Sequence, residues 1–485
     1  MRYILDARYY LRGWHGAPSG LYDTQRRKAV FFDQALYKLL LKCDAVQEID
    51  TASLSVKENE LLKSLLNEEV IREAGRWDFL LEEQRYHAYP ARYRRNVHWS
   101  ITGTCNLRCR HCFMSAPHAK HGMPSKEELL NVVEQLAECG VTSAEITGGE
   151  PLMREDFLEI VEALLDHGIT IPTIYSNGWL VDEKLLDALE ARGLKPSFQI
   201  SFDGLGHHDF LRGVPGAEKH AAEAIKLLRQ RGNTVSVAMC IHRGNASSLR
   251  ETVKFLASLG VRSMKCGTMM DLGEWSDPEL ADLKLSPQEE LEVFEQYIPQ
   301  YFEDDAPLSI MMSGAFLYEK DRDNWGVFYH RECASDKEDE MLSCPVLAHC
   351  FYIGADGVVA PCQGMCDCDF GKNFPTLKEK TLSEILTDSD YVKYSYATVG
   401  DVRRGNDECR KCEFIDRCTG SCRSTAIVAG DNYYGVDPQA CYFFKNGWED
   451  RIRAAAQPAF EAYIKRNPPE EKDGGRDDNE AAPCP

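Results

Sequence analysis

Three cysteines stand close together in the first third of the chain, in the segment Cys105-Asn-Leu-Arg-Cys109-Arg-His-Cys112. This segment directly follows a strand-like run at 97–102, so the three thiols can converge on one point beyond a strand end. A structural zinc ion prefers four closed ligands, usually from two Cys-x2-Cys pairs, and this segment offers three. Three soft thiolates suit an iron-sulfur cluster that keeps one iron open for a small molecule. The spacing therefore favours an iron-sulfur site.

The motif resembles that of the radical S-adenosylmethionine (SAM) enzymes. The resemblance implies that Cys105, Cys109 and Cys112 hold a [4Fe-4S] cluster whose open iron binds the amino and carboxylate groups of SAM. Reductive cleavage of SAM would give a 5′-deoxyadenosyl radical, with electrons from a reductant such as flavodoxin or ferredoxin. One residue departs from the family pattern, because His111 stands where a bulky aromatic residue usually packs on the adenine. We expect His111 to take that place.

Polar motifs follow the next predicted strands. In Thr147-Gly-Gly-Glu-Pro151 the paired glycines let the backbone approach a ligand closely, and the carboxylate can hold an ammonium group. Hydroxyl, amide and carboxylate groups after the third and fourth strands suit the ribose hydroxyls of SAM. The family pattern places an arginine near the SAM carboxylate, although a surface charge beside a helix is an alternative role for it. The expected SAM contacts are His111, Gly148, Gly149, Glu150, Ser176, Asn177, Ser201, Asp203 and Arg212.

A second set of cysteines occupies the last third of the chain. Its order, with a Gly-x4-Cys element and the spacing Cys-x2-Cys-x5-Cys-x3-Cys, resembles the SPASM extension of radical SAM enzymes, which carries two auxiliary iron-sulfur clusters. A pair of zinc ribbons would need two Cys-x2-Cys pairs, and only Cys409 and Cys412 form one. The resemblance assigns auxiliary cluster I to Cys344, Cys350, Cys362 and Cys422, and auxiliary cluster II to Cys409, Cys412, Cys418 and Cys441.

The fourth ligand of auxiliary cluster I is left open by the sequence. If Cys350 is bound, that cluster is closed and relays electrons. If it is not, an open iron could hold a substrate thiolate. Cys366 and Cys368 lie nearby in the chain, and either could replace Cys350. The cofactors implied by the resemblance are three [4Fe-4S] clusters and S-adenosyl-L-methionine.

Strands and helices alternate with short connections from Val97 to about Gly267, which is typical of βαβ units and a parallel sheet. Six such units predict an α/β fold, a partial (β/α)6 TIM-type barrel, in which chemistry collects at the carboxyl ends of the strands. The expected strands are 97–102, 144–147, 171–176, 198–202, 235–241 and 261–266. Each polar motif named above follows one of them.

The first 85 residues have a different pattern. Two strands joined by a turn near 23–25, a helix begun by Asp33 and a helix begun by the capping box of Ser55 and Glu58 predict a winged-helix-like domain. This order resembles the PqqD-like peptide-recognition domain of enzymes that mature ribosomally made peptides. Such domains bind a leader peptide as an added strand. A capping domain without a ligand is the alternative.

The remaining domain boundaries follow from composition and from the positions of proline and glycine. The stretch at 86–96, with Pro90, reads as a solvated connector. We expect the domains 1–85 for leader-peptide recognition, 86–96 as a linker, 97–300 as the radical SAM partial barrel, 301–343 as a bridging region, 344–450 as the SPASM domain, 451–466 as a C-terminal helix and 467–485 as a disordered tail.

Composition limits the partners. The chain has 56 basic and 77 acidic residues, a net charge of −21, which argues against nucleic acid and anionic membrane surfaces. No apolar run reaches the length of a membrane span, and the first residues are too polar for a signal peptide. Its 19 cysteines would be reduced in the cytoplasm, where metal binding explains them better than disulfides do. We therefore expect a cytoplasmic protein.

The expected function is that of a radical SAM oxidoreductase that matures a precursor peptide. The resemblance favours a cysteine thioether (sactionine-type) crosslink. The alternatives are another peptide crosslink, α-carbon epimerisation, or anaerobic sulfatase maturation to formylglycine. The last is disfavoured because Gln363 stands where such enzymes carry a carboxylate. A zinc-rich scaffold that binds peptides without catalysis is the alternative from another class.

Overall fold

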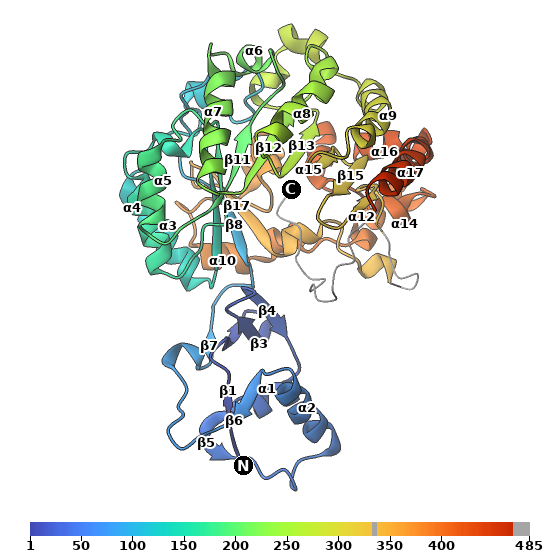
Figure 1. The fold of residues 1–485 in the computed structure, drawn as a ribbon. Helices are drawn as coiled ribbons and strands as arrows, with labels where there is room; N and C mark the ends of the chain where they lie inside the picture. Colours follow the sequence, from blue (N-terminus) through green and yellow to red (C-terminus); the bar gives the residue numbers. More distant parts are fainter. Residues whose placement is uncertain (332–336, 469–485) are drawn as a thin grey trace.

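A long mixed sheet forms the centre of the computed structural model, which describes residues 1–331 and 337–468 (Figure 1). Its strand order is β16-β15-β14-β13-β12-β11-β10-β9-β8-β17-β18, and β8 to β14 run parallel. The strands are β8 (Asn96–Ser100), β9 (Ser143–Thr147), β10 (Thr173–Ser176), β11 (Ser197–Ser201), β12 (Val235–Cys240), β13 (Ser263–Gly267), β14 (Ser309–Met312), β15 (Phe316–Glu319), β16 (Asn324–Gly326), β17 (Cys350–Ile353) and β18 (Val359–Ala360).

Helices cover one face of this sheet. Buried strand residues such as Val97 and Ile146 form one hydrophobic core with buried helix residues such as Leu136 and Ile160. These helices are α3 (Lys126–Glu138), α4 (Phe157–Asp166), α5 (Glu183–Glu190), α6 (His208–Arg212), α7 (Ala217–Gln230), α8 (Leu249–Ser258) and α9 (Pro287–Glu303). The predicted partial TIM-type barrel is therefore confirmed.

One barrel strand was missed. The sequence prediction ended the parallel strands before Gly267, but β14 pairs in parallel with β13 and belongs to the stretch expected as a bridging region. Several turns and the long helix α9 separate this four-residue strand from β13. The sequence therefore lacks the short strand-to-helix connection that indicated the other βα repeats.

The C-terminal part joins the barrel through the hairpin of β17 and β18, because β17 adds to β8 in parallel. Short helices follow, and the last, α17, lies against α9 (Figure 1). They are α10 (Leu382–Thr387), α11 (Ser389–Ser395), α12 (Val399–Gly405), α13 (Asp407–Arg410), α14 (Ile415–Cys418), α15 (Arg423–Gly430), α16 (Pro438–Lys445) and α17 (Trp448–Arg466). Most of the expected disordered tail at 467–485 lies outside the described residues.

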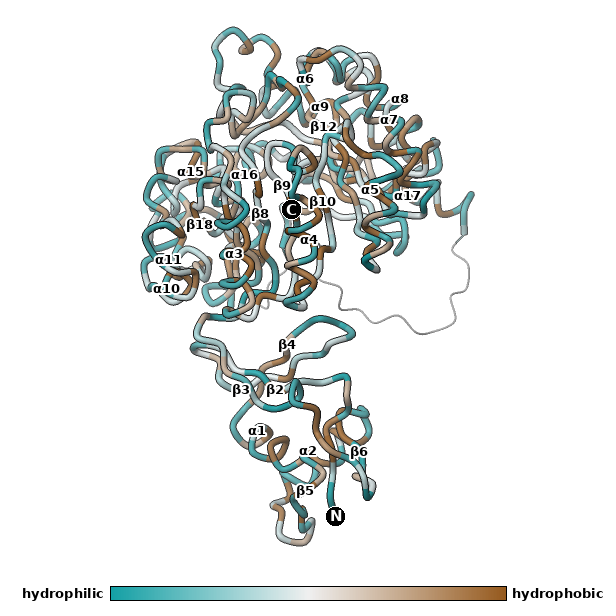
Figure 2. Tube along the Cα trace, turned by 90° about the vertical axis from the view of Figure 1, so that its left-hand side faces the viewer, coloured by the Kyte–Doolittle hydropathy of each residue, from teal (hydrophilic) through white to brown (hydrophobic). Residues whose placement is uncertain are grey.

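The N-terminal residues form a separate lobe (Figures 1 and 2). It holds the sheets β5-β1-β6 and β4-β3-β2-β7, with a core of its own. The predicted hairpin, the Asp33 cap and the capping box of Ser55 and Glu58 are present. Two strands at the start, β1 and β2, were not predicted. The elements are β1 (Arg2–Leu5), β2 (Tyr9–Trp14), β3 (Ala17–Asp23), β4 (Lys28–Phe31), α1 (Gln34–Leu40), β5 (Asp44–Glu48), α2 (Val56–Asn67), β6 (Ile71–Glu73) and β7 (His87–Ala88).

The segment between the lobe and the barrel is not the solvated connector that we expected. Arg94 is fully buried, and its Nη1 donates to the carbonyl oxygen of Ala348 at 3.2 Å and to the hydroxyl of Tyr396 at 2.6 Å. Its guanidinium also lies over the Tyr396 ring, 4.8 Å from the centroid. The arginine therefore ties the segment to the C-terminal domain, because a buried guanidinium needs acceptors and two of these come from a distant part of the chain.

A charged contact joins the loop after the cysteine motif to the β17–β18 hairpin and to the segment that follows it. His121 Nδ1 lies 2.6 Å from Asp356, and its Nε2 lies 2.8 Å from Asp367. Lys120 also reaches Asp367, at 2.9 Å. The hydrogen bonds to Asp356 and Asp367 raise the pKa of His121 to about 9.

We predict that this contact weakens in alkaline solution. The pKa of His121 in the folded chain exceeds its ordinary value of 6.5, so its stabilisation is complete below about pH 6.5 and is lost as the pH rises through about 9. The full contribution is about 3 kcal/mol. The difference in unfolding temperature between the parent chain and His121→Gln should therefore shrink between these two pH values. A difference that stays constant across that range would contradict the prediction.

No helix within the two described ranges combines the length and apolarity needed to span a bilayer.

Candidate functional site

The cysteine motif lies on the loop that leaves β8 at its carboxyl end. Backbone bonds hold this loop against α6: the amide of Arg108 donates to the carbonyl of Arg212 at 3.1 Å, and that of Arg110 to Leu211 at 2.9 Å. Gly213 has a φ of 68°, and a Cβ there would lie 2.2 Å from the Arg108 carbonyl oxygen. The close approach of the cysteine loop to α6 therefore requires a glycine.

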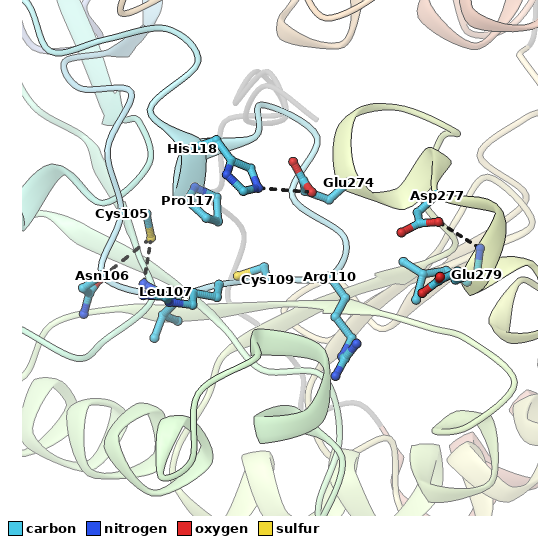
Figure 3. Close-up of a pocket in the computed structure, with 12 residues that line it drawn as sticks. Cys105, Asn106, Leu107, Cys109, Arg110, Pro117, His118, Glu274, Asp277 and Glu279 are labelled. Atoms are coloured by element: carbon cyan, nitrogen blue, oxygen red, sulfur yellow. Dashed lines mark hydrogen bonds and ion pairs between the residues drawn. The ribbon is translucent and has the colours of Figure 1, made fainter.

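A cavity of about 590 Å³ opens beside the thiols of Cys105 and Cys109 (Figure 3). His118 on the cysteine loop and Glu274 on the opposite wall approach each other to 3.7 Å. Glu274 is fixed there by its amide, which donates to the carbonyl of Cys112 at 2.9 Å. The site thus offers three thiols on one loop beside an open volume, which fits an iron-sulfur cluster held by three cysteines.

Burial keeps the thiols protonated while no metal is bound to them. Burial raises the pKa of Cys105 to about 12 and that of Cys112 to about 11. Burial also raises the pKa of Cys109, although the Arg212 guanidinium, 3.7 Å from its sulfur, opposes this. Thiolates are the ligand form, so these groups need a metal to become ionised at neutral pH. A cluster would supply that charge.

Two glycines bring the end of β9 onto the cysteine loop. The amide of Gly149 donates to the carbonyl of Thr102, and that of Glu150 to the carbonyl of Thr104, each at 2.8 Å. A Cβ on Gly148 would lie 2.6 Å from the Thr102 oxygen, and a Cβ on Gly149 only 2.1 Å from the Thr104 oxygen. The glycine pair is therefore needed for the two strand ends to meet.

We predict that Gly149→Ala pushes the cysteine loop away from β9. Misplacing binding groups by about an ångström costs roughly 100-fold, and we expect a loss of that size in SAM affinity. Equilibrium dialysis of SAM with the reconstituted protein measures it. Gly326→Ala is the control, because a Cβ at that glycine meets no atom within 4 Å. An unchanged SAM affinity in Gly149→Ala would contradict the assignment.

Glu150 is fully buried at the centre of this region. Its carboxylate accepts hydrogen bonds from the Ser176 hydroxyl at 3.0 Å and the Asn177 amide at 2.8 Å. Burial raises its pKa to about 7. The side chain of Asn177 donates to Asn106 Oδ1 at 2.8 Å, so the end of β10 is linked to the cysteine motif. A ligand ammonium beside Glu150 would hold the carboxylate in its charged form.

Asp203 and Arg212 form a buried ion pair below the cysteine loop. Arg212 Nε donates to Asp203 Oδ2 at 2.6 Å, and the amide of Cys240 donates to the other carboxylate oxygen at 3.0 Å. Arg212 is thus not the surface charge that was its alternative role. Burial raises the pKa of Asp203, but the charge of Arg212 lowers it well below its usual range. The carboxylate is therefore committed to protein partners rather than to a ligand alone.

His111 is buried beside this ion pair. Ligating atoms of His111, Asp203 and Cys240 lie within 4.8 Å of one another, and His111 Nδ1 has no hydrogen-bond partner in the described part of the chain. Burial lowers the pKa of His111 to about 3, so the ring is neutral. Ser201, at the end of β11, is half-buried on the same side of the sheet.

Several residues that support the site were missed by sequence reasoning. The amide of Asp203 donates to His208 Nδ1 at 2.9 Å, and Asn245 Nδ2 donates to the carbonyls of Asp203 and Cys240 at 2.8 Å. Their only sequence signal is that they follow predicted strands, as the other polar groups do.

The C-terminal cysteines fall into two groups. Burial raises the pKa of Cys362 to about 12, and nearby Cys422 and Cys344 raise it as well, which places these three together. Burial raises the pKa of Cys441 to about 11, with Cys409 and Cys412 among the neighbours that act on it. The fourth member of this second group is Cys418, whose pKa is raised by burial, Asp437 and Cys441. The assignment of these thiols to two auxiliary clusters stays a prediction.

Cys350 has a different setting. It lies on β17, where Asn96 Nδ2 of β8 approaches its sulfur to 3.6 Å. Cys366 lies beside the first group, with its sulfur 3.9 Å from the carbonyl oxygen of Cys362. The fourth ligand of that group therefore stays a prediction.

Comparison with known proteins agrees with this geometry. The radical SAM superfamily matches residues 99–256, and the SPASM iron-sulfur cluster-binding domain matches residues 344–413. The AdoMet-dependent heme synthase of Oleidesulfovibrio alaskensis is 24% identical over 365 residues, which cover 72% of this chain and 87% of that protein. The sporulation killing factor maturation protein SkfB of Bacillus subtilis is 28% identical over 291 residues, which cover 60% of this chain and 62% of that protein.

The fold has a counterpart among solved structures. The crystal structure of Streptococcus suis SuiB bound to its precursor peptide SuiA aligns with 90% of this chain and 99% of that chain, with a TM-score of 0.61 and 15% sequence identity. The two family matches fall on the two cysteine-bearing parts of this fold, so the chain is an enzyme with a radical SAM domain at 99–256 and a SPASM iron-sulfur cluster-binding domain at 344–413.

Proposed function

We propose that the chain modifies a ribosomally made precursor peptide, and that the product is a cysteine thioether crosslink. The observation that carries this proposal is the N-terminal lobe, which stands apart from the barrel and is not needed to complete it (Figure 1). Two relatives support it by their names, since SkfB is a maturation protein and SuiB was crystallised with its precursor peptide. The protein would act in the cytoplasm, where its thiols stay reduced.

The lobe offers an edge for an added strand. In the order β4-β3-β2-β7, β4 lies at the end of the sheet. Ala29 is buried, whereas Val30 is 58% exposed and Phe31 is 41% exposed. Exposed apolar side chains on an edge strand are a liability unless a partner covers them. A leader peptide that pairs with β4 would use the backbone for affinity and these side chains for packing.

We predict that Val30→Glu weakens precursor binding by roughly tenfold, because it places a charge where the leader strand would pack. The fold should tolerate the change, since the side chain is exposed. Fluorescence anisotropy with a labelled precursor measures the affinity. Val46→Glu, also at an exposed valine of the lobe but on β5 of the other sheet, is the control and should bind normally. Equal affinities of the two variants would refute β4 as the docking edge.

Different residues of the barrel have different roles in the proposed reaction. Cys105, Cys109 and Cys112 would hold a [4Fe-4S] cluster, which with SAM supplies a 5′-deoxyadenosyl radical that removes hydrogen from a carbon of the peptide. Glu150 would orient the SAM ammonium, while the buried His111 and the buried Asp203–Arg212 pair would lie beside SAM. The two C-terminal cysteine groups would hold auxiliary clusters that accept the electron left on the peptide. The protein would thus hold three clusters in all.

The test uses a short precursor peptide encoded beside the gene. The anaerobically reconstituted protein is incubated with SAM, a flavodoxin or chemical reductant, and the peptide. We expect 5′-deoxyadenosine, together with a peptide that is lighter by two hydrogens at a cysteine. A peptide of unchanged mass with an inverted residue would instead indicate epimerisation.

The heme synthases among the relatives favour one other candidate, a tetrapyrrole substrate, because their similarity spans 72% of this chain. Product formation with a porphyrin, and none with the peptide, would replace the peptide proposal. Absence of iron from a correctly prepared sample would support the zinc scaffold instead.

A further inference from the structure

Arg94 is a buried cation without a counter-charge. Its side chain is fully buried, and a guanidinium is always charged in proteins. Its hydrogen-bond partners in the described ranges are three neutral oxygens, which Nη1 contacts: the Tyr93 carbonyl at 3.0 Å, the Ala348 carbonyl at 3.2 Å and the Tyr396 hydroxyl at 2.6 Å. No carboxylate of the described residues pairs with it. Since an isolated buried charge is costly, this arginine calls for an anion.

Several donors around Arg94 are also unused. Its Nε and Nη2 atoms are buried and have no hydrogen-bond partner in the described part of the chain. The hydroxyl groups of Tyr391 and Ser395, one turn apart on α11 and just before Tyr396, are buried without a partner as well. The Tyr396 ring lies under the guanidinium, 4.8 Å away, but an aromatic face supplies only a partial negative charge. The surroundings of Arg94 therefore hold unused donors and a full positive charge.

The carbonyl that Arg94 contacts belongs to a segment with a cysteine at each end. Ala348 ends the short helix Pro345–Ala348, whose N-cap is Cys344, and Cys350 follows two residues later at the start of β17. Four residues of a 3₁₀ helix span about 8 Å, and two residues of a strand span about 6.6 Å. Both thiols are therefore on the order of 10 Å from the guanidinium.

The β17–β18 hairpin brings a third cysteine to the same end of the sheet. The two strands are antiparallel, so the start of β17 and the end of β18 lie at one end of the hairpin. Cys362 follows β18 by two residues, and Cys350 opens β17. β8 begins there too, since Asn96 pairs with Cys350 and its Nδ2 lies 3.6 Å from the cysteine sulfur (Figure 1). Arg94, two residues before Asn96, thus enters the fold beside these cysteines.

The environment of Tyr391 agrees with this placement. Burial raises the pKa of its hydroxyl, the charge of Arg94 opposes this rise, and the thiols of Cys366 and Cys350 add to it. The arginine and the cysteines of this end of the hairpin therefore surround one tyrosine.

An iron-sulfur cluster on these cysteines would supply the missing negative charge. Each thiolate ligand is an anion, and net charge is one of the properties that set the reduction potential of such a cluster. Reduction adds one electron, so a nearby cation stabilises the reduced form more than the oxidised form. At about 10 Å and an effective dielectric constant of about 20, one charge changes the ratio of the two forms roughly tenfold.

We propose that Arg94 is the counter-charge of auxiliary cluster I and raises the reduction potential of that cluster. The inference deepens the proposed function and rests on it, since the proposed function places a cluster there. It makes auxiliary cluster I a better electron acceptor: one electron leaves the peptide radical, which is oxidised, and enters the cluster, which is reduced. Arg94 acts on this transfer through its charge alone, because its hydrogen bonds go to protein oxygens.

The test measures potentials without turnover. In the full-length starting chain Cys105, Cys109 and Cys112 are replaced by alanine, so that the auxiliary clusters alone remain. Redox titration of the anaerobic protein, followed by electron paramagnetic resonance, gives their two midpoint potentials. Arg94→Gln then removes the charge but keeps a donor for the Tyr396 hydroxyl. We expect one of the two potentials to fall by about 59 mV, the one-electron equivalent of a tenfold change, and the other to stay.

Three further variants separate charge from structure. Arg94→Met, a second neutral variant, should give the same fall as Arg94→Gln. Arg94→Lys keeps the charge and should keep most of the higher potential. Arg76→Met, the same loss of charge at an exposed arginine of the N-terminal lobe, should leave both potentials unchanged. Circular dichroism checks that each variant is folded.

Two unchanged potentials in Arg94→Gln, an equal fall of both, or the same fall in Arg94→Lys would overturn the inference. The proposed function fails in a different way. Iron analysis that finds no auxiliary cluster in the starting chain would refute the cluster assignment, and this inference with it. A fall of one potential in a protein that forms no crosslink would keep the inference and refute the crosslink.

Discussion

A chain in which Cys105, Cys109 and Cys112 are all replaced by alanine should form no 5′-deoxyadenosine and should bind about four fewer iron atoms than the parent. The reason is geometric. The three thiols lie on one loop beside the 590 Å³ cavity, and the two C-terminal cysteine groups belong to another domain. Removing the loop ligands should therefore empty one site and spare the others.

The variant should keep its fold. The three cysteines are only partly buried, and the loop is fixed by backbone bonds to α6 and β9 that need no thiol. Iron analysis and the absorbance of the remaining clusters measure the loss of iron, and circular dichroism checks that the fold is kept. Cys139→Ala is a matched control, since this cysteine is buried in the barrel core outside all three groups. Undiminished 5′-deoxyadenosine in the triple variant would mean that the radical site lies elsewhere.

Sequence periodicity predicted the barrel well because its strands obey a simple rule. Residues such as Val97, Ile146 and Val237 are buried against helices, so each strand carries apolar side chains at every second position, and helices of ordinary length separate the strands. Which of the cysteines share a cluster stays a prediction of their spacing.

What the sequence could not predict depends on contacts between distant segments. The strands β1 and β2 are short, and besides β5 and β3 they pair with β6 and β7 from the far end of the lobe. From the sequence, Arg94 is indistinguishable from a solvated charge of a linker. Its burial becomes evident only in the fold, which brings Tyr396 and Ala348 to it. The same holds for Arg212, whose burial depends on the pairing of its segment with the cysteine loop.

Arg212→Met should destabilise the protein by about 3–5 kcal/mol, because it leaves the carboxylate of Asp203 buried without its counter-charge. Arg212 and Asp203 are 9% and 0% exposed, and the Nε to Oδ2 distance is 2.6 Å. Methionine fills a similar volume, so the loss comes mainly from the orphaned charge. It should also weaken SAM binding, since Arg212 lies 3.7 Å from the sulfur of Cys109.

The double variant Asp203→Asn/Arg212→Met separates charge from packing. With no charge left in the buried pair, this variant should recover most of the lost stability. The asparagine side-chain oxygen can still accept the hydrogen bond from the amide of Cys240. SAM affinity should stay low in both variants if Arg212 itself contributes to the site. Urea unfolding and SAM dialysis measure the two quantities, and Arg110→Met, an exposed position on the same loop, should change stability by less than about 0.5 kcal/mol. If the double variant were as unstable as Arg212→Met, the orphaned charge would not explain the lost stability. The loss would then come from weaker packing of α6 against the cysteine loop.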